Sequence, residues 1–103
     1  MRSGEIAMID FGVPIGSAPA LVRPAVVVTA QPTLAEFEQT FHVVPITNTP
    51  RRWPSDVTTG RGHAQCHLVG IADQSQVVER TSENVGPVTL AQIRETVSVL
   101  LGS

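Results

Sequence analysis

The sequence has no lysine, a single cysteine and no long apolar run, and each of these features excludes or favours certain classes of protein. The lone Cys66 cannot form an internal disulfide, which fits a reducing compartment. No apolar stretch approaches the roughly 20 residues that cross a bilayer, and the N-terminal segment meets an acidic residue too early for a secretory signal peptide. We therefore expect a cytoplasmic protein with no membrane partner.

The charge is weakly negative, with a formal net charge of −2. The field of the whole molecule therefore does not attract nucleic acid, and any RNA site must be local. All seven basic residues are arginine, the side chain whose planar guanidinium grips phosphate through paired hydrogen bonds. Five of them lie in the first 61 residues, namely Arg2, Arg23, Arg51, Arg52 and Arg61.

With 103 residues, 42% of them hydrophobic, the chain suits one domain over residues 1–103. Its hydrophobic core would be small, so association with a partner subunit would add to its stability. Short apolar segments bounded by Gly, Pro and Ser predict strands near residues 5–12, 24–30, 41–47 and 55–59, with more between 64 and 79. Pro45 inside the third strand indicates an edge strand or a bulge.

The C-terminal segment 88–103 has helical periodicity, since four apolar residues share one face: Leu90, Ile93, Val97 and Leu100. Thr89 and Gln92 have the spacing of a capping box at its start. Thr33 and Glu36 have the same spacing and predict a short helical turn. Strands with one terminal helix indicate a small, strongly curved antiparallel sheet or barrel.

The motif HAQCH places His63, Cys66 and His67 close together, which raises the question of a metal site. Three ligands within five residues of a strand would point to both faces, and no second cluster completes a tetrahedron. We therefore expect no metal and interpret the motif as a strand with exposed histidines and a buried thiol. Each histidine alone is a candidate acid or base, but nothing in the sequence brings the histidines together.

Arg23 and Thr47 are the stronger candidate pair. Thr47 ends one predicted strand and Arg23 stands at the start of another. If these strands are antiparallel neighbours, the two side chains share a rim. The alternatives are a surface salt bridge for Arg23 and a plain strand position for Thr47.

The order and spacing of several short motifs resemble the MazF/PemK family of toxin–antitoxin endoribonucleases. The resemblance covers nearly the whole chain: GEI at 4–6, Asp10, GS at 16–17, RPA at 23–25, VP at 44–45 followed by Thr47, DQ at 73–74, and the last helix. It implies a homodimer of mainly β subunits, each a small SH3-like antiparallel β-barrel of the CcdB/MazF/PemK type with a short helix and a C-terminal amphipathic helix. It also implies metal-independent, cofactor-free cleavage of single-stranded RNA at short sequences, inhibition of translation and growth, and silencing by a cognate antitoxin.

Carried over residue by residue, the resemblance makes Arg23 and Thr47 the catalytic candidates. Ser17, Asp73 and Gln74 match positions that line the substrate groove. Asp73 is also a general-base candidate, provided that its pKa is raised.

Four further residues are candidates for contact with the RNA. We assign Asn48, which follows Thr47, and the loop residues Arg51 and Arg52 to substrate binding, with Trp53 stacking a base. A solvated loop with Trp53 packed on the core is the alternative for this segment.

The chain departs from the family pattern at Ala7, Ala18 and Ile71, and after the DQ pair. We therefore expect its target sequence to differ. Two other functions stay open at this point: a non-enzymatic CcdB-like module that acts on a protein, and an inactive member that only sequesters an antitoxin.

Overall fold

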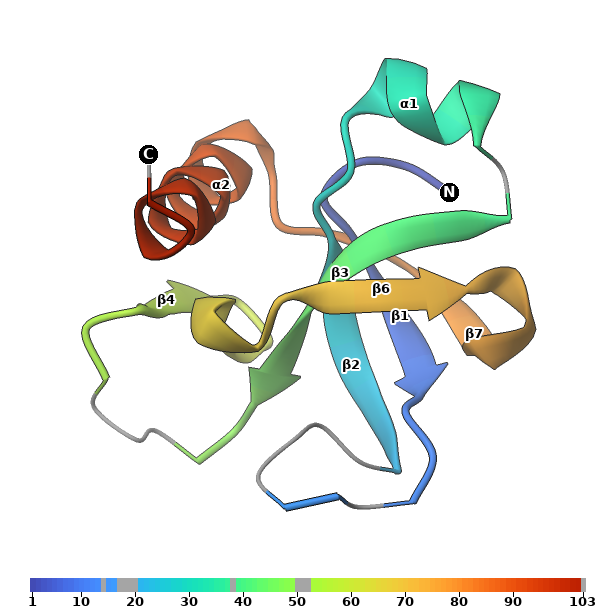
Figure 1. Cartoon of the computed structure of the whole chain (residues 1–103), viewed down its shortest axis with the longest axis horizontal. Coiled ribbons are helices and arrows are strands. Elements are labelled where there is room, and N and C mark those ends of the chain that lie inside the picture. The colour runs from blue at the N-terminus through green and yellow to red at the C-terminus, as the bar shows by residue number, and fades with distance from the viewer. Residues whose placement is uncertain (14, 17–20, 38, 50–52, 103) are drawn as a thin grey trace.

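Seven strands of the computed structural model form one sheet within the residues that it describes, which are 1–13, 15–16, 21–37, 39–49 and 53–102 (Figure 1). In chain order the elements are β1 (Glu5–Asp10), β2 (Val22–Val27), α1 (Gln31–Glu36), β3 (Thr40–Thr47), β4 (Asp56–Thr59), β5 (Gly62–Gln65), a 3-10 turn (Cys66–Leu68), β6 (Gly70–Asp73), a second 3-10 turn (Gln74–Gln76), β7 (Val77–Asn84) and α2 (Pro87–Leu100).

The sheet is antiparallel and open. Its strand order is β4-β5-β3-β2-β1-β7, and β6 pairs with β3 beside this path. The predicted class, mainly β with a short helix and a C-terminal helix, is confirmed. The expectation of a closed barrel is wrong, because closure requires the two end strands to pair, and among the described residues β4 pairs only with β5 and β7 only with β1.

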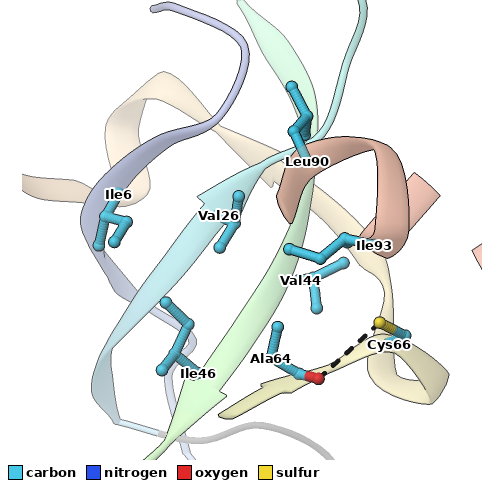
Figure 2. Close-up of a cluster of buried hydrophobic side chains, with 8 residues drawn as sticks. All are labelled: Ile6, Val26, Val44, Ile46, Ala64, Cys66, Leu90 and Ile93. Atoms are coloured by element: carbon cyan, nitrogen blue, oxygen red, sulfur yellow. Dashed lines mark hydrogen bonds between the residues drawn. The ribbon is translucent and has the colours of Figure 1, made fainter. Parts of the chain in front are cut away.

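Alternation along the strands divides the core into two clusters, one on each face of the sheet. On the first face, Leu90 and Ile93 of α2 pack over the strands beside Val26 and Val44 (Figure 2). The second face carries the cluster of Ala7, Ile9, Ala25, Val27, Leu34, Phe41, Val43 and Ala72. The predicted apolar face of α2 is thus correct for Leu90, Ile93 and the partly buried Val97, whereas Leu100 is 47% exposed.

Both helices begin before the hydroxyl residues that were predicted to cap them. The N-cap of α2 is Gly86 and that of α1 is Ala30, and neither makes a side-chain capping bond. A proline lies in the first turn of each helix, where its fixed φ favours helix initiation and its missing N–H costs nothing. Thr33 and Thr89 therefore lie inside their helices, and the predicted capping boxes are wrong.

An ion pair between the buried Glu5 carboxylate and the exposed Arg80 guanidinium joins β1 to β7. The Arg80 guanidinium donates from Nε to Glu5 Oε2 at 2.7 Å and from a terminal nitrogen to Oε1 at 2.8 Å. The Glu5 side chain is only 7% exposed. Hydrogen bonds from Arg80 lower the pKa of the Glu5 carboxyl against the opposing effect of burial. Glu5, one of the residues that carry the family resemblance, thus has a structural role.

Among the described residues, no helix is both long enough and apolar enough to span a membrane.

Candidate functional site

β2 and β3 are antiparallel neighbours, as predicted, and their pairing ends before it reaches Arg23 and Thr47. The ladder matches Val27 with Val43, Val26 with Val44 and Ala25 with Pro45. Beyond Pro45 no described residue of β3 pairs with β2, while Ile46 and Thr47 pair with β5 on the opposite side of β3. Figure 1 shows the end of β3 and the start of β2 diverging from this point.

Two prolines lie where the strands separate. Pro24 pairs with Met8 of β1, but no described residue of β3 pairs with it. Pro45 lies in β3 between the residues that pair with β6, which end at Val43, and those that pair with β5. Since neither proline has an N–H to donate, both fit positions where a ladder is interrupted. Of the two alternatives predicted for Pro45, an edge strand or a bulge, the edge strand is wrong, because β3 is internal and the proline lies where β3 changes partner.

Arg23 and Thr47 flank this opening and leave the same face of the sheet. Ala25 and Pro45 are paired, and Arg23 and Thr47 lie two residues further along their own strands, so alternation keeps both on that face. The same register extended by two residues would set them opposite each other. Arg23 is half-buried and Thr47 is 6% exposed, so both stand at the margin of the core.

The two side chains have few other partners. The Thr47 hydroxyl accepts the N–H of Thr49 at 3.2 Å, which fixes the oxygen in a local turn. Within the described part of the chain, neither an ion pair nor a side-chain hydrogen bond engages the Arg23 guanidinium, so the surface salt bridge considered for it is not formed there. An uncompensated guanidinium beside an oriented hydroxyl is suited to binding an anion such as a phosphate.

β5 brings a third polar side chain to this end of the sheet. His63 is paired with Thr47 of β3 and with Thr58 of β4. A Cβ built on the preceding Gly62 would lie 2.6 Å from the Thr47 carbonyl oxygen and 3.0 Å from Asn48 Oδ1. Only glycine therefore permits this approach of β5, and the exposed Asn48 lies within the same cluster. The sequence offered His63 as an acid–base candidate but could not place it beside Thr47, because that contact depends on this non-local pairing.

Asp73 and Gln74 lie elsewhere. Asp73 is paired with Thr40, the first residue of β3, whereas Thr47 is the last. Seven residues of extended chain correspond to about 23 Å. The pair therefore lies at the opposite end of the strand from Arg23 and Thr47.

The Asp73 carboxylate is already occupied by local structure. Its Oδ2 accepts the Ser75 N–H at 2.8 Å and the Gln39 side-chain N–H at 3.0 Å, and the Asp73 N–H donates to Gln76 at 2.8 Å. Hydrogen bonds from Ser75 and then from Gln39 hold the pKa of this carboxyl below its ordinary value. The raised pKa that a general base at this position requires is absent.

Three predicted binding residues, Ser17, Arg51 and Arg52, lie outside the described residues. The neighbouring Trp53 is 42% exposed and meets His67 edge to face, with ring centroids 4.2 Å apart. Stacking of an RNA base on Trp53 stays a prediction.

The HAQCH segment is not one continuous strand, because β5 ends at Gln65 and a 3-10 turn begins at Cys66. Cys66 is fully buried and His67 is exposed, as expected. Burial, and then the nearby Asp56, raise the pKa of the Cys66 thiol to about 11. The described residues contain no group of three His, Cys, Asp or Glu side chains that could hold a metal ion.

Comparison with known proteins agrees with this architecture. The model of the PemK-like, MazF-like toxins of type II toxin–antitoxin systems matches residues 2–101. Among solved structures, MazF from Deinococcus radiodurans superimposes with a TM-score of 0.87 at 18% identity, over 100% of this chain and 97% of the other. An endoribonuclease from Mycobacterial species in complex with its cognate antitoxin gives a TM-score of 0.79 at 18% identity, over 99% and 95% of the two chains. No curated protein matches the sequence.

Proposed function

The chain belongs to the PemK-like, MazF-like toxins of type II toxin–antitoxin systems, and from this membership we propose that it is a metal-independent, sequence-specific endoribonuclease. Its substrate is single-stranded RNA, and its activity stops translation and growth. The observation that carries the proposal is the shared face of Arg23 and Thr47 beside the opening between β2 and β3.

The reaction would use the RNA 2′-hydroxyl as the nucleophile. Attack on the adjacent phosphorus forms a 2′,3′-cyclic phosphate and releases a 5′-hydroxyl end, so the protein need only orient the phosphate, stabilise charge on its oxygens and move protons. Arg23 would hold two phosphate oxygens through its planar guanidinium as their negative charge grows. Thr47 would donate its hydroxyl hydrogen to one of them, since the oxygen already accepts from Thr49.

The remaining candidates would hold the RNA strand on either side of the cleaved linkage. Asn48 lies beside Thr47, and we assign Ser17, Arg51 and Arg52 to substrate binding from their match to the family and their charge. Asp73 and Gln74 would contact the strand several nucleotides away, because they face the start of β3. This position and its lowered pKa disfavour Asp73 as the general base.

We also propose that the protein acts in the cytoplasm as a homodimer and is silenced by a cognate antitoxin. The relative from Mycobacterial species was solved with such an antitoxin. A second subunit would add to the modest core of a 103-residue chain.

The proposed function is tested by incubating purified protein with single-stranded RNA in EDTA and identifying the new ends. We expect a 2′,3′-cyclic phosphate and a 5′-hydroxyl, and sequencing of the 5′-hydroxyl ends gives the cleaved motif. Arg23→Ala should lower the rate by about 10²–10³-fold, as removal of one donor to a transition-state oxyanion does.

The matched control is Arg2→Ala, which makes the same change of charge at an exposed residue near the other end of β2. It should cleave like the wild type. Product formation by Arg23→Ala at the wild-type rate would contradict the assigned role. A wild-type protein that gives no product at any concentration but captures a protein target would favour the CcdB-like alternative.

A further inference from the structure

Neither Arg23 nor Asp73 is suited to act as the general base of the proposed reaction. Arginine holds its proton too firmly, with a pKa above about 12, to accept one easily. Asp73 lies at the far end of β3 with its carboxylate oxygen already accepting two hydrogen bonds. The proposed reaction therefore still requires a group near Thr47 that changes its protonation state around neutral pH.

His63 has the required position. It is directly paired with Thr47 across β3 and β5, so the two side chains leave the same face, with Cβ atoms about 4.5–5.5 Å apart. Arg23 leaves this face as well, from the other side of β3. His63 and Thr47 thus place an imidazole beside a hydroxyl at this end of the sheet.

The position of His63 is held by its neighbours. Gly62 brings β5 so close to the end of β3 that a Cβ there would collide with the Thr47 carbonyl oxygen at 2.6 Å. On the other side, β4 pairs along the whole of β5, with Thr58 opposite His63. His63 itself is only half-buried, so an RNA strand can reach the imidazole.

The charged groups around His63 come from three elements. β2 contributes Arg23 and the β4–β5 turn contributes Arg61, which is bound to Glu83 at 2.8 Å. β4 contributes Asp56, two residues from Thr58 and therefore on the same face. Both Asp56 carboxylate oxygens are buried without a hydrogen-bond partner in the described structure.

We propose that His63 is the general base of the cleavage, an inference that rests on the proposed endoribonuclease function. Its unprotonated ring nitrogen takes the proton of the RNA 2′-hydroxyl as the 2′-oxygen bonds to phosphorus. The bond from phosphorus to the 5′-oxygen breaks, and the imidazolium returns a proton to that oxygen, directly or through water. The products are the 2′,3′-cyclic phosphate and the 5′-hydroxyl, and no co-reactant is consumed.

The test compares His63→Gln and His63→Asn with the matched control His42→Gln. His42 is an exposed histidine on β3, paired with Ile71 and outside the proposed machinery. We expect both His63 variants to cleave about 10²–10⁴-fold more slowly, the usual contribution of general acid–base catalysis, while His42→Gln keeps the wild-type rate. Far-UV circular dichroism and binding of a 2′-deoxy substrate analogue should stay unchanged in all three.

The pH profile separates a catalytic from a structural role. In the wild type, kcat/KM should rise with pH as an imidazole loses its proton and then level off, and the His63 variants should lose this rise in their residual activity. A His63 variant with the wild-type rate or the wild-type pH profile would overturn the inference, provided that Arg23→Ala is inactive and the wild type gives cyclic phosphate. Absence of product from the wild type would instead reject the proposed function, and the role of His63 with it.

Discussion

Polar residues lie at both ends of β3, but those at its start are engaged in hydrogen bonds within the protein, whereas those at its end are largely unengaged. At its start, Thr40 faces Asp73, whose carboxylate accepts two hydrogen bonds and whose N–H donates to Gln76. At its end, Thr47 accepts one hydrogen bond and faces His63, and the Arg23 guanidinium has no ion-pair partner among the described residues. Polar groups at the start of β3 are used in local hydrogen bonds, and those at its end are available to bind a ligand.

This contrast separates Arg23 from Asp73, two charged candidates that the sequence offered for different roles in the site. Asp73 and Arg23 both matched the family pattern, but hydrogen bonds lower the pKa of Asp73 and make it a poorer base. The difference shows that polar atoms without a hydrogen-bond or ion-pair partner identify a site residue better than its sequence motif alone.

Of the variants that compare the two ends of β3, Thr47→Ala is expected to have the largest effect. Thr47→Ala should lower kcat/KM for RNA by about 10–100-fold, because a hydrogen bond to a charged group contributes about 1.5–3 kcal/mol. Thr40→Ala removes the same hydroxyl at the other end and should leave the rate unchanged. Single-turnover cleavage assays measure both. Equal effects of the two variants would abolish the distinction between the ends.

A smaller effect is expected when the approach of β5 to Thr47 is disturbed. Gly62 has φ +143°, and its added Cβ would meet the Thr47 carbonyl oxygen. Gly62→Ala should lower the free energy of unfolding by about 1–3 kcal/mol through backbone strain and also slow cleavage. Urea denaturation followed by circular dichroism measures the stability.

Gly60→Ala is the control, because a Cβ there meets nothing within 4 Å. It should change neither stability nor cleavage by much. A Gly62→Ala protein as stable and as active as the Gly60→Ala protein would show that the close contact of β5 with β3 does not matter to the site.

The smallest expected effect concerns Asp73. Its lowered folded-state pKa means that its ionised form stabilises the fold. That contribution is present above the ordinary carboxyl pKa and is lost as the pH falls through the lowered value. Asp73→Asn should therefore reduce the urea midpoint slightly at neutral pH, with the difference shrinking in acid, and should leave the pH profile of cleavage unchanged. A shifted cleavage profile would restore Asp73 as a candidate base.

The order of elements was predictable because it depends on local patterns. Alternation of apolar residues gave the strands, and the period of Leu90 and Ile93 gave α2. The helix starts were mispredicted where proline competed with a hydroxyl cap, since both signals lie within one turn. β2 and β3 are antiparallel neighbours, as the predicted rim requires, but their pairing ends at Ala25 and Pro45, so the shared rim of Arg23 and Thr47 stays a prediction.

The sequence by itself determined which residue types are available: an arginine before a buried strand, a threonine at the end of another, and a family pattern over residues 2–101. The tertiary structure decided that β3 exchanges β6 for β5 at Pro45, which brings His63 to Thr47 and leaves Asp73 at the far end. Strand pairing joins residues far apart in the chain, and its register depends on the packing of the whole sheet, so no local pattern could specify it.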